Sequence, residues 1–269
     1  MNLKTIIAIA FSCLLLLTYT RAQEKPFPDW NGRSCAVVLT YDDGLNVHLD
    51  KVIPVLDSLG FRATFYVPCN SPSLAKRLNE WRTIALHGHE LGNHTLFHPC
   101  FGKSQARTWV KPEYDLDTYT MPWMIDEIRL ANAFLQAIDG KKERTFAYTC
   151  GDNTIGNVSF VDSIRNDFVG ARGVKAGMNP KSIPDLFDLM TYTVDGQTAD
   201  ELTRLVDQAI IEHTLLVFLF HGVGGEHPMN ISLPEHNKLM RYLKKSEKDI
   251  WVAPMVEVST YIRESQAKK

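Results

Sequence analysis

Short apolar runs alternate with helical patterns along most of the chain, and this alternation limits the fold more than any other feature of the sequence. Buried strands are expected over residues 35–40, 63–67, 145–148, 215–220 and 250–253, where leucine, β-branched and aromatic side chains cluster. Apolar residues recur at helical spacing between them, for example over residues 49–59 and 124–138. Strand and helix alternating for about seven rounds build a parallel sheet. We therefore predict an α/β fold whose sheet is either open or closed into a barrel.

Local signals predict where several helices begin and end. Gly60 is expected to stop the first helix, and Pro54 lies inside its apolar pattern, which predicts a kink or a shorter helix. Another helical stretch is expected from residue 73 to about residue 86. Capping boxes, in which a Ser or Thr precedes a Glu by three positions, predict the first turns of two later helices: Thr198 with Glu201, and Ser232 with Glu235.

The first 22 residues are expected to be a cleaved secretory signal. Lys4 supplies a positive start, residues 6–17 form an apolar run too short to span a bilayer comfortably, and Ala22 ends a small-residue cleavage pattern before Gln23. An uncleaved membrane anchor is the alternative. With the signal removed, we expect residues 23–269 to form one catalytic domain without stable membrane insertion, exported to the periplasm or the extracellular space.

The net charge limits which partners the protein is expected to bind, and the cysteine count indicates whether disulfides can form. The full chain has a formal net charge of −2, and removing residues 1–22 takes away Lys4 and Arg21 but no acid, which leaves −4. A mildly acidic protein of this kind is not expected to bind nucleic acid or an anionic membrane. An even number of cysteines in an exported domain permits disulfides without specifying the pairs, and four remain: Cys35, Cys69, Cys100 and Cys150.

Polar side chains follow several predicted strands at their carboxyl ends, where the chemistry of a parallel α/β fold is expected. Asp42 and Asp43 end the first strand. Adjacent carboxylates repel each other, so they need a cation, a metal or a shared proton to compensate their charge. The alternative is a simple turn, because Asp-Gly is a common turn dipeptide. His94 and His98 follow a further strand, the third along the chain, expected between His89 and His94, and His221 ends the strand at 215–220. Two histidines in a His-Thr-Leu-Phe-His spacing can converge on one ion, and a carboxylate from a neighbouring strand would complete three ligands with a position left open.

Three motifs resemble those of the polysaccharide deacetylase family, also called the NodB homology domain or carbohydrate esterase family 4. LTYDDG at residues 39–44 resembles the T-F-D-D-G motif, HTLFH at 94–98 the H-[ST]-x-x-H motif, and LVFLFH at 216–221 the L-x-L-x-H motif. Order and spacing match over roughly residues 33–263. The resemblance implies a distorted (β/α) barrel of about seven parallel strands.

The resemblance also implies a role for each site residue. Asp43, His94 and His98 would bind a divalent metal, with zinc as the expected ion. Asp42 would be the general base for the attacking water, and His221 the general acid that protonates the leaving group. The two carboxylates of LTYDDG would then have separate functions.

Two further family motifs are degenerate in this chain. R-x-P-[YF]-G falls on residues 147–151, so the arginine that usually orients the base is replaced by Ala147. The backbone N–H of Cys150 would still donate a hydrogen bond to the oxyanion. D-x-x-D-W has no full match, and Asp195 is the nearest candidate to tune His221.

Aromatic residues on the long loop at residues 99–123 could form a substrate-binding lid or pack structurally: Trp109, Tyr114, Tyr119 and Trp123. Cys100 and Cys150 lie near the same predicted rim and could form a disulfide, with Cys69 as a competing partner. The remaining histidines are expected to pack, cap helices or lie on the surface: His48, His87, His89, His213, His227 and His236.

We therefore expect an exported, metal-dependent deacetylase whose substrate is an acetylated polysaccharide or oligosaccharide. N-deacetylation of an amino-sugar polymer is the first interpretation, and hydrolysis of O-acetyl esters, as on xylan, is the enzymatic alternative. A carbohydrate-binding protein that keeps the metal without turnover is the alternative from another class. Retention of both Asp42 and His221, which metal binding alone does not need, favours the enzyme.

Overall fold

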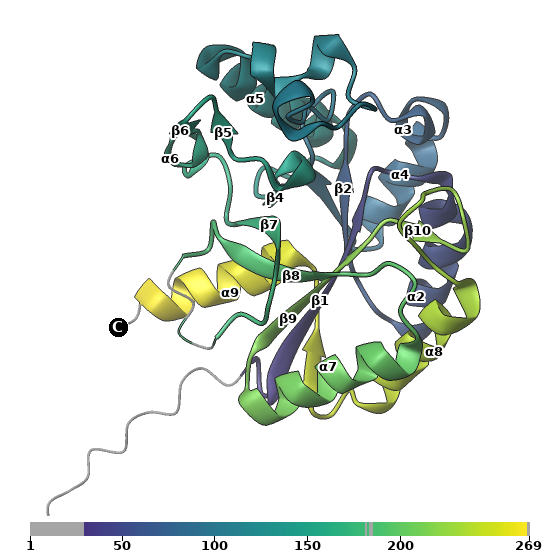
Figure 1. Ribbon diagram of the computed structural model, residues 1–269. Coiled ribbons are helices and arrows are strands. Elements are labelled where there is room, and N and C mark those ends of the chain that lie inside the picture. The colour runs from purple at the N-terminus through teal and green to yellow at the C-terminus, as the bar shows by residue number, and fades with distance from the viewer. Residues whose placement is uncertain (1–29, 181, 183–184, 268–269) are drawn as a thin grey trace, which may run out of the picture.

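The computed structural model describes residues 30–180, 182 and 185–267 (Figure 1). The predicted signal segment, residues 1–22, and its cleavage point lie outside the described residues. The described part forms a barrel of parallel strands surrounded by helices (Figure 1).

Seven parallel strands close the barrel in the order β1, β2, β3, β4, β7, β8 and β9, and β9 pairs back onto β1. Their bounds are Cys35–Asp42, Thr64–Val67, Glu90–Asn93, Phe146–Ala147, Ala171–Ala176, Leu189–Thr193 and Leu215–Phe220. An eighth strand, β12 (Ile250–Val252), pairs with the first half of β1, whereas β2 pairs with its second half. This architecture confirms the predicted α/β barrel of about seven parallel strands.

Helices cover the outside of the barrel (Figure 1). They are α2 (Ile53–Leu59), α3 (Pro72–Lys76), α4 (Leu78–Leu86), α5 (Met121–Asp139), α6 (Val161–Ile164), α7 (Ala199–Glu212), α8 (Leu233–Lys245) and α9 (Met255–Ala267). The loops contain two small two-stranded sheets: β5 (Thr154–Ile155) with β6 (Val158–Ser159), and β10 (Gly222–Val223) with β11 (Asn230–Ile231). The apolar face predicted for α5 is buried, so the helical spacing there reflects packing against the barrel.

The first helical pattern is divided at its amino end. A π-helical turn, His48–Val52, precedes α2, so Pro54 lies in the first turn of α2, where its missing N–H costs no helical hydrogen bond. Gly60 ends α2 in the left-handed conformation at φ 71°, as predicted. The helical stretch expected at 73–86 is broken at Arg77 into α3 and α4.

One predicted capping box is complete and the other is half formed. Thr198 and Glu201 exchange both hydrogen bonds at the start of α7. Ser232 accepts a hydrogen bond from the Glu235 N–H, but the Glu235 carboxylate accepts from the Ala199 N–H, 2.5 Å away, and so ties α8 to the start of α7. The prediction of the second capping box was therefore wrong for the hydrogen bond from the Ser232 N–H to the Glu235 side chain.

Candidate active site

The LTYDDG segment sends its two carboxylates in different directions. Asp42 is the last residue of β1 and is buried, whereas Asp43 adopts a left-handed conformation at φ 74°. Gly44 follows at φ 58°, and a Cβ on it would lie 2.7 Å from Cγ1 of Val67, so the close approach of the turn to β2 requires glycine. The reversal separates the Asp43 carboxylate from that of Asp42.

His94 and His98 lie on one turn that begins where β3 ends at Asn93. The Asn93 side chain accepts a hydrogen bond from the Thr95 N–H at 2.8 Å, and the Thr95 hydroxyl accepts from the His98 N–H at 2.9 Å. These bonds hold the two imidazole rings with centroids 4.7 Å apart. The His-Thr-Leu-Phe-His spacing thus brings both rings to one place, as predicted.

The histidine pair faces one oxygen of Asp43. Oδ1 of Asp43 lies 3.8 Å from Nε2 of His94 and 3.4 Å from Nε2 of His98. Nδ1 of His94 lies 2.9 Å from the Ala147 carbonyl, so its N–H donates there and the lone pair of Nε2 points to the site. Burial, together with the neighbouring His98, holds the pKa of His94 well below its usual value, which keeps the ring neutral.

These three side chains fit a divalent metal. Their ligand atoms all lie within 4.8 Å of one another, and two imidazole nitrogens with one carboxylate oxygen form a donor set typical of catalytic zinc. The hydrogen bond from His94 to a backbone carbonyl is the outer-shell contact that usually orients a ligating histidine.

Asp42 pairs with an arginine that the sequence analysis missed. Arg172 of β7 is fully buried, donates a hydrogen bond to Oδ1 of Asp42, and places its guanidinium carbon 4.6 Å from the ring centroid of Tyr66. Arg172 is the register neighbour of Ala147 on β4, the residue that replaces the arginine of the R-x-P-[YF]-G motif, so its side chain occupies the position next to that missing arginine. The arginine partner of Asp42 therefore comes from β7, the strand beside β4, and not from the R-x-P-[YF]-G motif.

The signal for this arginine in the sequence is weak. Strands β7 and β8 were not among the predicted strands, because glycines and charged residues interrupt the run around Arg172. Without β7 there is no register that places Arg172 beside Ala147.

His221 lies on the opposite side of Asp43. Its Nε2 is 3.9 Å from Oδ2 of Asp43, and its carbonyl lies 2.8 Å from Nε2 of His48. Burial lowers the pKa of His221, against the opposing effect of the two nearby aspartates. Asp195 does not tune it: Oδ1 of Asp195 accepts a hydrogen bond from the Asn230 N–H at 3.2 Å, and Nδ1 of His221 has no hydrogen-bond partner among the described residues. The predicted contact between Asp195 and His221 is therefore not formed.

His227 is a second residue that the sequence analysis missed. We expected it on the surface or in packing, yet its ring stacks on His221 with centroids 4.5 Å apart, and its Nε2 lies 3.6 Å from Oδ2 of Asp43. A glycine-rich turn after β9 brings it back to the site, and the sequence signal is only a histidine six positions after His221.

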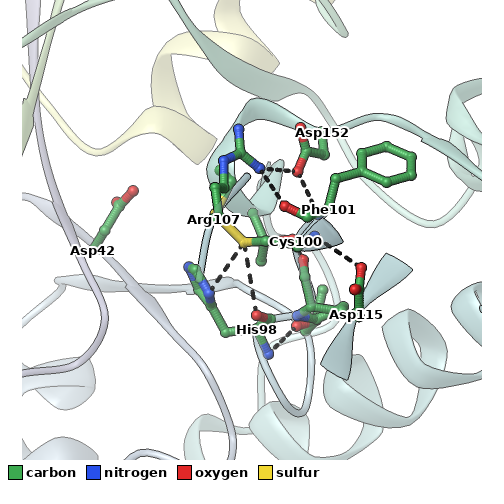
Figure 2. The surroundings of a disulfide bond; sticks show 12 residues. Asp42, His98, Cys100, Phe101, Arg107, Asp115 and Asp152 are labelled. Atoms are coloured by element: carbon green, nitrogen blue, oxygen red, sulfur yellow. Dashed lines mark hydrogen bonds and ion pairs between the residues drawn. A yellow bond between two sulfur atoms is a disulfide. The ribbon is translucent and has the colours of Figure 1, made fainter. Parts of the chain in front are cut away.

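A disulfide joins two walls of the site. Cys100 and Cys150 are bonded, while Cys69, the competing partner, and Cys35 are free. Cys150, whose N–H is the predicted oxyanion donor, adopts φ 57° and lines the cleft. Figure 2 shows Arg107 and Phe101 converging on Asp152 beside the disulfide, with Asp42 across from it.

The site opens into a cleft of about 800 Å³. Of the four aromatic residues named for the lid hypothesis, Trp109 lines this cleft and is 63% exposed. Tyr114 stacks on Phe97, and Tyr119 stacks on Trp123 with centroids 4.6 Å apart. The lid hypothesis therefore rests on Trp109, and the other three aromatic residues pack against neighbours.

Within the described residues, no helix combines the length and the apolar character needed to cross a bilayer.

The sequence matches the polysaccharide deacetylase family over residues 31–162. A gellan lyase from Bacillus sp is 28% identical over 145 residues, a match that covers 54% of this chain but only 5% of the lyase.

Solved structures share the barrel. A putative polysaccharide deacetylase from Mycobacterium smegmatis superposes with a TM-score of 0.63 at 14% identity, covering 87% of this chain and 92% of that one. The Xyl-CE4 domain of a multidomain xylanase from the hindgut metagenome of Trinervitermes trinervoides gives a TM-score of 0.55 at 14% identity, covering 84% and 90%. At these identities the likeness establishes the fold alone.

Proposed function

The chain belongs to the polysaccharide deacetylase family, and we propose that it is a metal-dependent hydrolase that removes acetyl groups from a carbohydrate polymer. N-deacetylation of an amino-sugar polysaccharide is the first reaction we assign. The observation that carries this proposal is the separation of the two adjacent carboxylates: Asp42 faces Arg172, and Asp43 faces His94 and His98.

Asp43, His94 and His98 would hold the ion, with zinc as the first candidate. When bound, a divalent ion supplies Lewis acidity at the acetyl carbonyl. The chain's own part is to orient the ligands, which the Ala147 carbonyl does for His94, while burial lowers the pKa of His94 and keeps that ring neutral.

Asp42 accepts the proton of the attacking water in this proposal. Arg172 binds Oδ1 of that carboxylate and leaves Oδ2 on the side of the cleft, 3.9 Å from Nε2 of His94. A bond then forms between the water oxygen and the carbonyl carbon, and the Cys150 N–H stabilises the negative oxygen.

His221 completes the reaction from the other side of Asp43. Its Nε2 donates a proton to the amine nitrogen as the carbon–nitrogen bond breaks, so the products are acetate and a free amino sugar. Because an ester oxygen can leave by the same route, O-acetyl groups are the alternative substrate.

Two features support an acetylated polysaccharide outside the cytoplasm as the substrate. Trp109 offers an exposed aromatic face at the edge of the cleft, a surface on which a sugar ring can stack. The bridge between Cys100 and Cys150 is of a kind that persists in oxidising compartments, which favours export to the periplasm or the extracellular space.

Acetate release from the zinc-loaded protein on N-acetylated chitooligosaccharides and on acetylated xylan, in parallel, tests this function. We expect release that is lost in Asp42→Asn and kept in Asp57→Asn, a matched change in a carboxylate that binds His87 and His89 away from the site. The preferred polymer separates amidase from esterase. No release from either polymer by a zinc-bound protein would favour the carbohydrate-binding alternative.

A further inference from the structure

The two oxygens of Asp43 face two different pairs of histidines. Oδ1 lies 3.8 Å from Nε2 of His94 and 3.4 Å from Nε2 of His98. Oδ2 lies 3.9 Å from Nε2 of His221 and 3.6 Å from Nε2 of His227. The site is therefore nearly symmetric about one carboxylate, although the proposed hydrolysis uses only one histidine pair as ligands.

The second triad has the donor chemistry and compactness of the first. The ligand atoms of Asp43, His221 and His227 also lie within 4.8 Å of one another. Nδ1 of His227 lies 3.2 Å from the Met229 carbonyl and 3.1 Å from the Met229 nitrogen, so the ring can donate or accept there. The tautomer that donates to the carbonyl leaves Nε2 free to ligate.

We propose that Asp43, His221 and His227 form a second divalent-cation site, with Asp43 as a bridging carboxylate between two ions. A carboxylate that bridges two metals presents one oxygen to each, which is how Asp43 faces its two histidine pairs. Paired metal sites in enzymes typically hold their ions about 3.5–4 Å apart.

Electrostatics predict that the second ion binds more weakly than the first. Two dications at this separation repel each other, and Asp43 is the one carboxylate that they share. Asp42, the other carboxylate nearby, is already paired with Arg172. We therefore expect two binding steps, with the second requiring a higher metal concentration.

Filling this second site should inhibit the enzyme, a consequence that rests on the proposed function. An ion on Nε2 of His221 occupies the atom that would otherwise carry the proton for the leaving group. Activity should thus rise with the first equivalent of zinc and fall as the second site fills.

Zinc titration of the metal-free full chain by calorimetry, with bound metal counted by mass spectrometry, tests the site without measuring activity. We expect two ions per chain in two steps. His227→Gln should weaken the second step at least about tenfold and keep the first, whereas His98→Gln should weaken the first. His87→Gln, a matched change in an exposed histidine that pairs with Asp57, should leave both steps unchanged.

A manganese-loaded sample adds a second readout, because two ions bridged by one carboxylate give a spin-coupled electron paramagnetic resonance signal. That signal should be present in the wild type and absent in His227→Gln. A single equivalent in the wild type up to millimolar zinc, or two unchanged steps in His227→Gln, would overturn the second site. Because these readouts do not depend on turnover, a failure to release acetate would count against the proposed function and leave the cation site standing.

Discussion

Replacing Arg172 should disable Asp42 without touching any proposed metal ligand. The guanidinium is fully buried and is the partner of an almost fully buried carboxylate. Removing one member of a buried ion pair typically costs about 3–5 kcal/mol, because the other charge remains buried and uncompensated. Arg172→Ala should therefore lower the free energy of unfolding by about 3–5 kcal/mol.

The same change should reduce catalysis through the position of the base. A displacement of a catalytic group by about 1 Å can cost on the order of 100-fold in rate, equivalent to about 2.7 kcal/mol. We thus expect kcat/KM to fall about 100-fold in Arg172→Ala with zinc stoichiometry unchanged. Arg172→Lys should recover part of the stability but less of the activity, because an ammonium cannot reproduce the fixed geometry of guanidinium.

Two double variants separate orientation of Asp42 from general damage to the core. Arg172→Ala combined with Asp42→Asn removes both charges, and urea unfolding should show a smaller loss of stability than the two single changes added together. Arg172→Ala combined with Ala147→Arg returns an arginine to the neighbouring strand, beside the vacated position, and should restore at least about tenfold of the lost activity. An unfolding free energy for Arg172→Ala within about 0.5 kcal/mol of wild type, with unchanged kcat/KM, would refute this reasoning.

Three other perturbations test separate parts of the structure. Burial lowers the pKa of His236 to about 4, so the unfolded state binds a proton at this residue first as the pH falls below 6.5. The free energy of unfolding should therefore fall by about 2 kcal/mol between pH 7 and pH 4.5 because of this residue alone. Urea unfolding of His236→Gln should show a shallower pH dependence. Reducing the disulfide between Cys100 and Cys150, which are 50 residues apart, should lower the free energy of unfolding by up to about 4 kcal/mol, measured by urea titration with and without reductant; no change would show that the bridge does not constrain the unfolded chain. Trp109→Ala should weaken oligosaccharide binding by about 1 kcal/mol, roughly fivefold, in calorimetry, and an unchanged affinity would remove Trp109 from the substrate site.

The barrel could be predicted because its strands and helices carry strong periodic signals. The strand at 215–220 was predicted with its observed bounds, and β1 extends only two residues beyond its predicted end. Strands β7 and β8 escaped prediction because burial is incomplete along them and charged or polar residues interrupt the apolar runs. Their pairing depends on the closed barrel, a tertiary constraint that local sequence does not carry.

The site divides in the same way. His94 and His98 come together as predicted because their spacing within one short motif fixes their directions, and Asp43 meets them because the parallel strands β1 and β3 end at the same rim of the barrel. Arg172 and His227 reach the site across strand register and a glycine-rich turn, so no local pattern indicates their partners. The contact expected between Asp195 and His221 is absent for the same reason. Asp195 is the nearest acidic candidate in the sequence, but its carboxylate accepts a hydrogen bond from the Asn230 N–H instead.

Metal content and acetate release, measured together on Asp42→Asn and Asp43→Asn, test the central claim that the two adjacent carboxylates have separate functions. We predict that Asp43→Asn loses the first zinc step and acetate release together, because its Oδ1 faces both ligating histidines. Asp42→Asn should keep that zinc step and lose acetate release. Equal loss of zinc in both variants, or acetate release that persists in Asp42→Asn, would contradict the division of roles.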